Sequence, residues 1–172
     1  YFPFAPGPGV GGHCIPIDPY YLAWKAKKIN ANAKFASLAS KINEKMPHYV
    51  SKIINKNLYK KKNNKIILLG MAYKPNVDDY RESSSLKILK ILKEKYRYKV
   101  DYNDPYVPYL KTKKIKFQKS KKLIYKNLKY YDATIILTNH DNYNYSLIKK
   151  YSNIIFDTRG VYKKASDKII KS

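Results

Sequence analysis

Lys65-Ile66-Ile67-Leu68-Leu69-Gly70 is the stretch that decides how this chain is expected to fold. An uninterrupted apolar run of this length is typical of a strand that is buried on both faces of a parallel sheet. The loop 71–82 follows, and Ser83 can then cap a helix over about 84–96, in which apolar side chains recur with helical spacing. The stretch therefore predicts the start of a β-α-β unit.

The chain after this unit repeats the alternation of short strands and helices. Strands are expected over 98–102, 115–117, 132–138 and 153–157, and helices over 121–128 and 145–151. Such alternation predicts an α/β domain built on a Rossmann-like, doubly wound parallel sheet.

Positively charged or titratable side chains follow the expected strand ends: Lys74, Arg81, His140 and Arg159. Ligands of doubly wound sheets bind beyond the carboxyl ends of the strands, and a cluster of cations there suits a diphosphate. Simpler interpretations stay open, because Arg81 could belong to a local ion-pair cluster and Arg159 could pair with Asp157. His140 is left out of the site, since a satisfied polar role is commoner for such a residue.

Residues 19–62, which precede the sheet, are expected to be mostly helical because apolar side chains recur every three or four positions. Asn30-Ala31-Asn32 is expected to divide a short helix from a longer one. Pro47 is expected to kink or restart the longer helix. These apolar stripes by themselves indicate core or interface.

The 172 residues are enough for one ordinary domain with an appendage. The polar segment 60–64 separates the helices from the sheet, so we expect two units, residues 1–63 and residues 64–172. The sequence starts at Tyr1 rather than Met, and we interpret it as the C-terminal part of a longer protein.

A glycine-rich loop near the start holds the only cysteine: Pro6-Gly7-Pro8-Gly9-Val10-Gly11-Gly12-His13-Cys14-Ile15-Pro16-Ile17-Asp18-Pro19. Asp18 is expected to cap a helix that begins at Pro19. The positive end of that helix would favour the Cys14 thiolate, which makes Cys14 a candidate nucleophile. The alternative for Cys14 is a small buried hydrophobic side chain.

The glycines of this loop formally match G-x-G-x-x-G. That dinucleotide motif requires a preceding strand and a helix directly after it, whereas prolines interrupt and follow the glycines here. We expect Gly9, Gly11 and Gly12 to let a ligand approach the backbone and the thiol. A surface glycine turn is the alternative.

Three motifs resemble the UDP-glucose/GDP-mannose dehydrogenase family. The cysteine loop is similar to its catalytic-cysteine motif, and residues 13–22 are more like the branch that acts on UDP-N-acetylglucosamine or UDP-N-acetylmannosamine. Gly-Met-Ala-Tyr-Lys-Pro-Asn-Val-Asp-Asp-Tyr-Arg-Glu-Ser at 70–83 is similar to a second motif, and Asp-Thr-Arg-Gly at 157–160 to a third. The resemblance extends over essentially the whole chain.

The resemblance implies a role for each matching residue. Cys14 would be the nucleophile and Asp18 its acid/base partner. Lys74 and Arg159 would bind the UDP-sugar, and its sugar would approach the backbone of Gly9, Gly11 and Gly12. Arg81 would reach the pyrophosphate of NAD. The helical region 33–62 would form the contact of a homodimer.

The implied reaction is a four-electron oxidation of the sugar C6 alcohol to a carboxylate. A first hydride passes to NAD+, Cys14 adds to the aldehyde, a second hydride leaves the thiohemiacetal, and water hydrolyses the thioester. The family's N-terminal NAD-binding Rossmann domain is absent from this chain, so the chain alone is expected to be inactive. A reactive thiol suits the reducing cytoplasm.

The composition raises one different function. A net charge of +24 and an isoelectric point near 9.9 could indicate nucleic-acid binding. We do not favour it, because 33 of the 36 basic residues are lysines scattered along the chain, which usually form solvated faces. An inert UDP-sugar-binding or dimerising fragment is the nearer alternative. No metal is predicted, since His13, His48 and His140 lack ligand spacing, and no apolar run is long enough for a membrane span.

Overall fold

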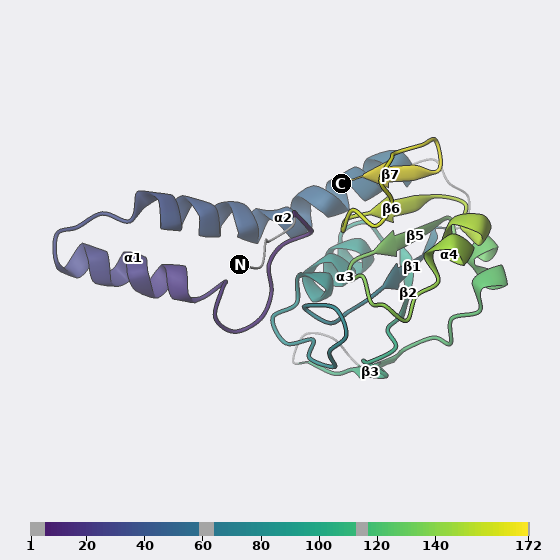
Figure 1. The fold of residues 1–172 in the computed structure, drawn as a ribbon, viewed down its shortest axis with the longest axis horizontal. Helices are drawn as coiled ribbons and strands as arrows, with labels where there is room; N and C mark the ends of the chain where they lie inside the picture. Colours follow the sequence, from purple (N-terminus) through teal and green to yellow (C-terminus); the bar gives the residue numbers. More distant parts are fainter. Residues whose placement is uncertain (1–5, 59–63, 113–116, 172) are drawn as a thin grey trace.

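The computed structural model describes residues 6–58, 64–112 and 117–171. Helices α1 (Asp18–Lys28) and α2 (Lys34–Leu58) lie side by side and form an arm that projects from a sheet domain (Figure 1). The break between them falls at residues 29–33, which confirms the division expected at Asn30-Ala31-Asn32. Helix α2 continues through Pro47 as one helix.

The sheet domain has a five-stranded, fully parallel sheet in the order β2-β1-β5-β6-β7. Its strands are β1 (Lys65–Leu69), β2 (Lys99–Asn103), β5 (Ala133–Ile136), β6 (Ile155–Asp157) and β7 (Ile169–Lys171). The chain runs outward from β1 to β2 on one side and returns to build β5 to β7 on the other. This reversal confirms the doubly wound α/β fold and places a topological switch point between β1 and β5.

Strand β1 consists almost entirely of apolar residues because both faces of the sheet are covered at this strand. Ile66 and Leu68 pack into one core cluster with α2 and with α3 (Ser84–Glu94). Ile67 and Leu69 pack into a second cluster on the other face, with the 3-10 helix η1 (Tyr125–Tyr130) and α4 (Tyr145–Tyr151). Successive side chains of a strand point to opposite faces, so helices on both faces require apolar residues at every position.

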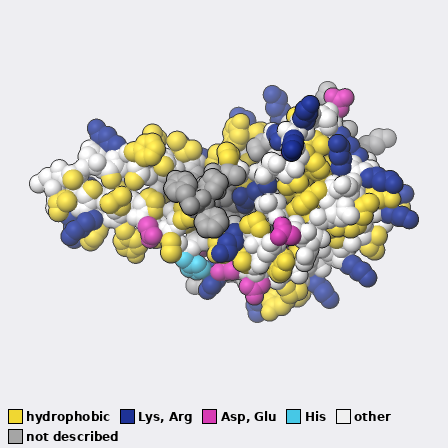
Figure 2. Space-filling view, in the orientation of Figure 1, with side chains coloured by type: hydrophobic (Ala, Val, Ile, Leu, Met, Phe, Trp, Pro, Cys, Tyr) yellow, Lys and Arg dark blue, Asp and Glu magenta, His cyan; other side chains and the backbone are white. Residues whose placement is uncertain are grey.

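The two halves of α2 have different surroundings. Val50, Ile54 and Leu58 are fully buried in the core of the sheet domain. In the arm, α1 has no buried residue, and large apolar side chains such as Trp24 and Phe35 are 56% and 85% exposed. Figure 2 shows apolar side chains spread over the surface of the arm. The expected stripe is therefore core in its second half and an exposed apolar surface in its first.

Several local predictions were wrong. Residues 121–128 do not form the expected helix, and η1 begins only at Tyr125. Lys121 N donates a hydrogen bond to Tyr102 O, and Asn103 Nδ2 donates one to Lys121 O. These two hydrogen bonds tie the start of the segment to the end of β2. Asp18 is not the N-cap, because a turn closed on Cys14 O brings Ile17 into helical backbone, and Asp18 is already the first helical residue.

Three short strands were not predicted. β3 (Tyr109–Leu110) and β4 (Gln118–Lys119) form an antiparallel pair beside the main sheet, and β7 closes its edge. Positions 115 and 116 of the expected strand 115–117 lie outside the described residues, and Phe117 is not in a strand. Predictions for the other strands and helices are confirmed in type.

Ser83 is the N-cap of α3, as the sequence predicts, and its side chain accepts a hydrogen bond from Ser85 N at 3.2 Å. Ser83→Ala is expected to lower the free energy of unfolding by about 1 kcal/mol, because one amide of the first helical turn loses its acceptor. Urea denaturation followed by circular dichroism measures this loss.

Ser85→Ala is the matched control. Ser85 Oγ is buried with no hydrogen-bond partner in the described part of the chain, so its removal is expected to be neutral or slightly stabilising. Equal losses in both variants would show that the cap contributes nothing.

Candidate functional site

The cysteine loop is fastened at the junction of the arm and the sheet domain. Val10 N donates to Asn43 Oδ1 at 2.7 Å, and Asn43 Nδ2 donates back to Val10 O at 3.3 Å. Ser84 Oγ donates to Gly9 O at 3.0 Å. Helices α2 and α3 therefore hold the loop from two directions.

The loop glycines permit close packing against the sheet domain. A Cβ at Gly11 would lie 2.8 Å from Glu82 O, and a Cβ at Gly12 would lie 3.0 Å from the ring of Tyr73. Gly9 and Gly12 also have φ values of 121° and 92°. Other residues of the protein therefore fill the space where side chains would lie at these glycines. A sugar could contact Gly9, Gly11 and Gly12, as predicted, only through their backbone atoms.

Cys14 and Asp18 lie within one turn of each other at the start of α1. Cys14 O accepts hydrogen bonds from Ile17 N at 2.9 Å and Asp18 N at 2.8 Å. Both side chains are exposed. The alternative of a buried structural cysteine therefore does not apply, and the thiol is accessible to a reactant.

Arg159 lies beyond the end of β6 and reaches under the cysteine loop. Its Nε donates to Leu137 O at 2.6 Å, and a Cβ at Gly7 would lie 2.7 Å from its Nη1. Burial lowers the pKa of Arg159 from its ordinary value. The guanidinium lines a pocket of about 430 Å³ together with Gly7, Gly9, Phe35, Ile42 and Met46.

The simpler interpretation of Arg159, an ion pair with Asp157, is not what the structure shows. The Asp157 carboxylate accepts hydrogen bonds from the backbone N–H groups of Arg159, Val161 and Tyr162. Within residues 6–58, 64–112 and 117–171, no carboxylate lies within 4.0 Å of the Arg159 side-chain nitrogens. A half-buried cation without a partner anion is suited to an anionic ligand.

Lys74 and Arg81 both lie in the segment between β1 and α3. Lys74 is exposed, with Nζ 5.4 Å from the centroid of the Tyr73 ring. Arg81 forms a forked pair with Asp79, Nε to Oδ1 at 3.0 Å and Nη2 to Oδ2 at 2.9 Å, and these hydrogen bonds lower the pKa of Asp79. Arg81 therefore forms the local ion pair that the sequence allowed. The predicted contact of Arg81 with a cofactor stays a prediction.

The expected gathering of cations at one edge of the sheet is only partial. Arg159 lines the pocket beneath the cysteine loop, whereas Arg81 lines a separate groove along α3. His140 is fully buried, in agreement with its omission from the site.

The sequence analysis missed Asp104 and Tyr73. Asp104 is a buried carboxylate that binds several backbone amides, and Tyr73 covers Gly12. In the sequence, Asp104 stands shortly after the strand expected over 98–102 and directly before Pro105, a pattern typical of an ordinary turn. No pattern in the sequence indicated the contact of Tyr73.

The described part of the loop 7–12 does not have the form of a dinucleotide fingerprint. No helix directly follows its glycines, since α1 begins only at Asp18, and Gly11 and Gly12 pack against Glu82 and Tyr73. The described residues also include no cluster of three side chains suited to a metal ion. None of the helices described is long and apolar enough to cross a membrane.

Comparison with known proteins finds one family over most of the chain. Residues 67–164 match the UDP binding domain, and residues 1–45 the central domain, of the UDP-glucose/GDP-mannose dehydrogenase family. A UDP-N-acetyl-D-mannosamine dehydrogenase of Methanococcus vannielii is 36% identical over 95% of this chain and 39% of its own length. A UDP-N-acetyl-D-glucosamine 6-dehydrogenase of Salmonella typhi is 37% identical over 62% of this chain and 26% of its own length.

A solved structure gives the same result in three dimensions. The UDP-D-ManNAc dehydrogenase of Pyrococcus horikoshii superimposes with a TM-score of 0.75 at 32% identity. The match covers 98% of this chain and 39% of that one. This chain thus spans about two-fifths of the length of the Methanococcus and Pyrococcus relatives.

Proposed function

The chain belongs to the UDP-glucose/GDP-mannose dehydrogenase family, and from this premise we propose that it supplies the cysteine loop and the UDP-sugar-binding domain of a UDP-N-acetylhexosamine 6-dehydrogenase. The complete enzyme would oxidise the sugar C6 alcohol to a uronate. Relatives named for both the mannosamine and the glucosamine substrate support the substrate class and leave the sugar open.

The observation that carries this proposal is the guanidinium of Arg159. It lies half-buried in a pocket beside the cysteine loop, with no carboxylate in contact in the described ranges. A diphosphate or a sugar carboxylate would provide the missing negative charge, and a guanidinium binds either with paired hydrogen bonds. Lys74, exposed in the loop after β1, would add a second positive charge.

Cys14 would carry the covalent chemistry. Its thiolate adds to the C6 aldehyde, forming a C–S bond while the carbonyl oxygen takes a proton, which gives a thiohemiacetal. Loss of a hydride and a proton from this adduct gives a thioester, and water then breaks the C–S bond to release the carboxylate and the thiol. Asp18, one turn away, would accept and return protons and orient the water.

Each oxidation needs a hydride acceptor, and the resemblance implies NAD. The described residues include no dinucleotide fingerprint, so we propose that NAD is bound outside this chain, with Arg81 reaching its pyrophosphate. A second copy of the chain would cover the exposed apolar side chains of the arm, in a homodimer through residues 33–62. The accessible thiol suits the cytoplasm.

We expect the chain to bind UDP-N-acetylmannosamine or UDP-N-acetylglucosamine selectively in a calorimetric titration at moderate salt. Arg159→Ala and Lys74→Ala are each expected to raise Kd roughly 10- to 100-fold, because each removes a charge-assisted hydrogen bond. Lys126→Ala is the matched control, since Lys126 is exposed on η1 and its loss removes the same charge.

Three outcomes would contradict the proposal. Equal losses in Lys126→Ala and Arg159→Ala would indicate general attraction of anions by a basic chain. Binding that falls steeply with salt and does not distinguish UDP-sugars from polyphosphate would favour the nucleic-acid alternative. Selective binding without uronate formation in the complete enzyme would identify an inert binding protein.

A further inference from the structure

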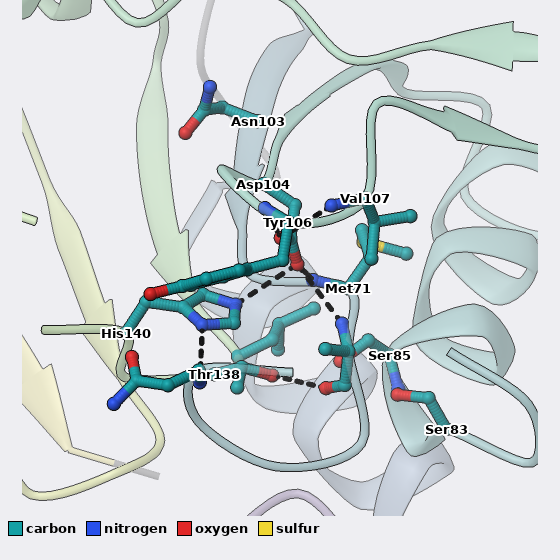
Figure 3. Close-up of polar contacts among 12 residues, drawn as sticks. Met71, Ser83, Ser85, Asn103, Asp104, Tyr106, Val107, Thr138 and His140 are labelled. Atoms are coloured by element: carbon teal, nitrogen blue, oxygen red, sulfur yellow. Dashed lines mark hydrogen bonds and ion pairs between the residues drawn. The ribbon is translucent and has the colours of Figure 1, made fainter. Parts of the chain in front are cut away.

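The side chains of Asp104 and His140 form a fully buried pair, which contacts both ends of the segment 71–76 that carries Lys74. Figure 3 shows the pair beside Met71. His140 Nε2 lies 3.1 Å from Asp104 Oδ2, and Asn76 N donates to His140 Nδ1 at 2.9 Å. Nδ1 must therefore be unprotonated, and Nε2 carries the proton that it donates to the carboxylate. Both ring nitrogens are engaged inside the protein, so His140 has no free nitrogen for a substrate.

The Asp104 carboxylate joins three strand ends. Asp104 itself directly follows β2. Its Oδ2 accepts hydrogen bonds from Met71 N at 2.6 Å and Ala72 N at 3.1 Å, two residues that follow β1. The same oxygen contacts His140, which follows β5. Its Oδ1 accepts from Tyr106 N at 2.8 Å and Val107 N at 3.0 Å. Burial alone would raise the pKa of Asp104, but the hydrogen bonds from His140 and these amides lower it, so the carboxylate stays ionised.

Asn76 fixes the other end of the same segment. Its backbone has a φ of 60°, a conformation that needs support in a residue other than glycine. Its N–H is bound to His140, its Nδ2 donates to Asp141 Oδ2 at 2.7 Å, and its Oδ1 accepts from Asp141 N at 3.0 Å. Residues 71–76 are therefore fastened to the sheet at both ends, and Lys74 lies between the two fastenings.

The segment 71–76 also supports the cysteine loop. The ring of Tyr73 lies against Gly12, two residues before Cys14. Tyr73 N donates to Asp79 O at 3.0 Å, which fixes the residue from its own loop. One short segment thus carries a predicted substrate-binding cation and forms part of the surface under the predicted nucleophile.

We propose that Asp104 and His140 are positioning residues of the nucleotide-sugar site, which hold residues 71–76 so that Lys74 and Tyr73 are in place before the ligand binds. This inference rests on the proposed function. A long lysine side chain on a loop that is already ordered loses less conformational entropy on binding, which increases affinity. Neither Asp104 nor His140 touches the ligand, and both act through the segment that they hold.

The test is a double-mutant cycle between His140 and Lys74, with calorimetric Kd values for UDP-N-acetylmannosamine. His140→Gln can keep the hydrogen bond to Asp104, His140→Asn can keep the one from Asn76, and His140→Leu keeps neither. His140→Leu is expected to raise Kd roughly three- to tenfold, with smaller effects for the two amide variants. In the Lys74→Ala background the same change is expected to have almost no effect.

A second measurement requires no variant. Nitrogen NMR of the imidazole ring in the unaltered chain should show His140 as the neutral Nε2–H tautomer, and hydrogen exchange should show protected amides at Met71, Ala72 and Asn76. A charged ring, the opposite tautomer or unprotected amides would overturn the inference, even if every His140 variant fails to fold.

The outcomes separate the inference from the proposed function. If the chain binds the UDP-sugar but His140→Leu weakens binding equally with and without Lys74, His140 acts only on general stability and the positioning role is wrong. If the unaltered chain binds no UDP-sugar, the proposed function and the positioning role both fail.

Discussion

Gly70→Ala is expected to lower the free energy of unfolding by about 3–5 kcal/mol, enough to leave much of the protein unfolded at 37 °C. Gly70 joins β1 to the segment that carries Lys74, and its φ is 85°, which residues with a side chain rarely adopt. A Cβ there would lie 2.5 Å from Thr138 O and 2.7 Å from Thr138 N. These are backbone atoms at the end of the neighbouring strand β5, so they cannot move aside without breaking the sheet.

Gly160→Ala is the control that measures the cost of backbone strain without a steric clash of the kind expected between a Cβ at position 70 and Thr138. Gly160 also has a positive φ, 69°, but no heavy atom lies within 4 Å of the place where its Cβ would be. Its substitution is expected to cost only about 1 kcal/mol, the strain of the left-handed conformation. Urea unfolding of both variants measures the difference, and equal losses would show that the contact with Thr138 is not as close as described.

The sheet could be predicted from the sequence because its signals are local. The run from Lys65 to Leu69 needed only its own apolar residues to indicate a strand buried on both faces, and Ser83 needed only the following periodicity to indicate a helix start. The alternation of such elements leaves few topologies, since crossovers between parallel strands are almost always right-handed. The doubly wound fold class follows from these signals, whereas the order of the strands is known only from the structure.

The rest depends on contacts between residues far apart in the sequence. Residues 121–124 are expected from the sequence to begin a helix, but hydrogen bonds of the Lys121 backbone with Tyr102 and Asn103 tie the segment to the end of β2 instead. Nothing near Val10 indicates Asn43 as its partner. Asp104 resembles an ordinary turn residue until Met71, Ala72 and His140 are brought to it by three different strand ends.

The candidate site also has features that the sequence predicts and features that only the packing shows. Motifs were enough to single out Cys14, Lys74 and Arg159, because a motif marks a position whatever its surroundings, and the roles of these residues remain proposals. The sequence did not show that Arg159 is half-buried with no described carboxylate in contact, that Arg81 is already paired with Asp79, or that Tyr73 packs against Gly11 and Gly12. Those facts depend on packing, and they determine which predicted contacts are free to be made.

Cys14→Ser is expected to reduce uronate formation by the complete enzyme at least about 1,000-fold, the scale of loss when a covalent nucleophile is removed. A serine hydroxyl at this exposed position is far less ionised than a thiol and is a weaker nucleophile. An aldehyde cannot lose a second hydride easily until a nucleophile or water has added to it. Product analysis by mass spectrometry would therefore show little or no uronate.

The binding of the UDP-sugar is the control for Cys14→Ser. Arg159 lies beneath the loop and is held by Leu137, and the loop is fastened through Val10 and Gly9, so none of these contacts involves the Cys14 side chain. Kd should therefore stay within about twofold of the unaltered value while uronate formation is lost. If uronate forms at the full rate, Cys14 is not the nucleophile. If Kd rises together with the loss of product, the thiol contributes to the shape of the site, and the covalent role would then have to be tested by trapping the thioester on the unaltered enzyme.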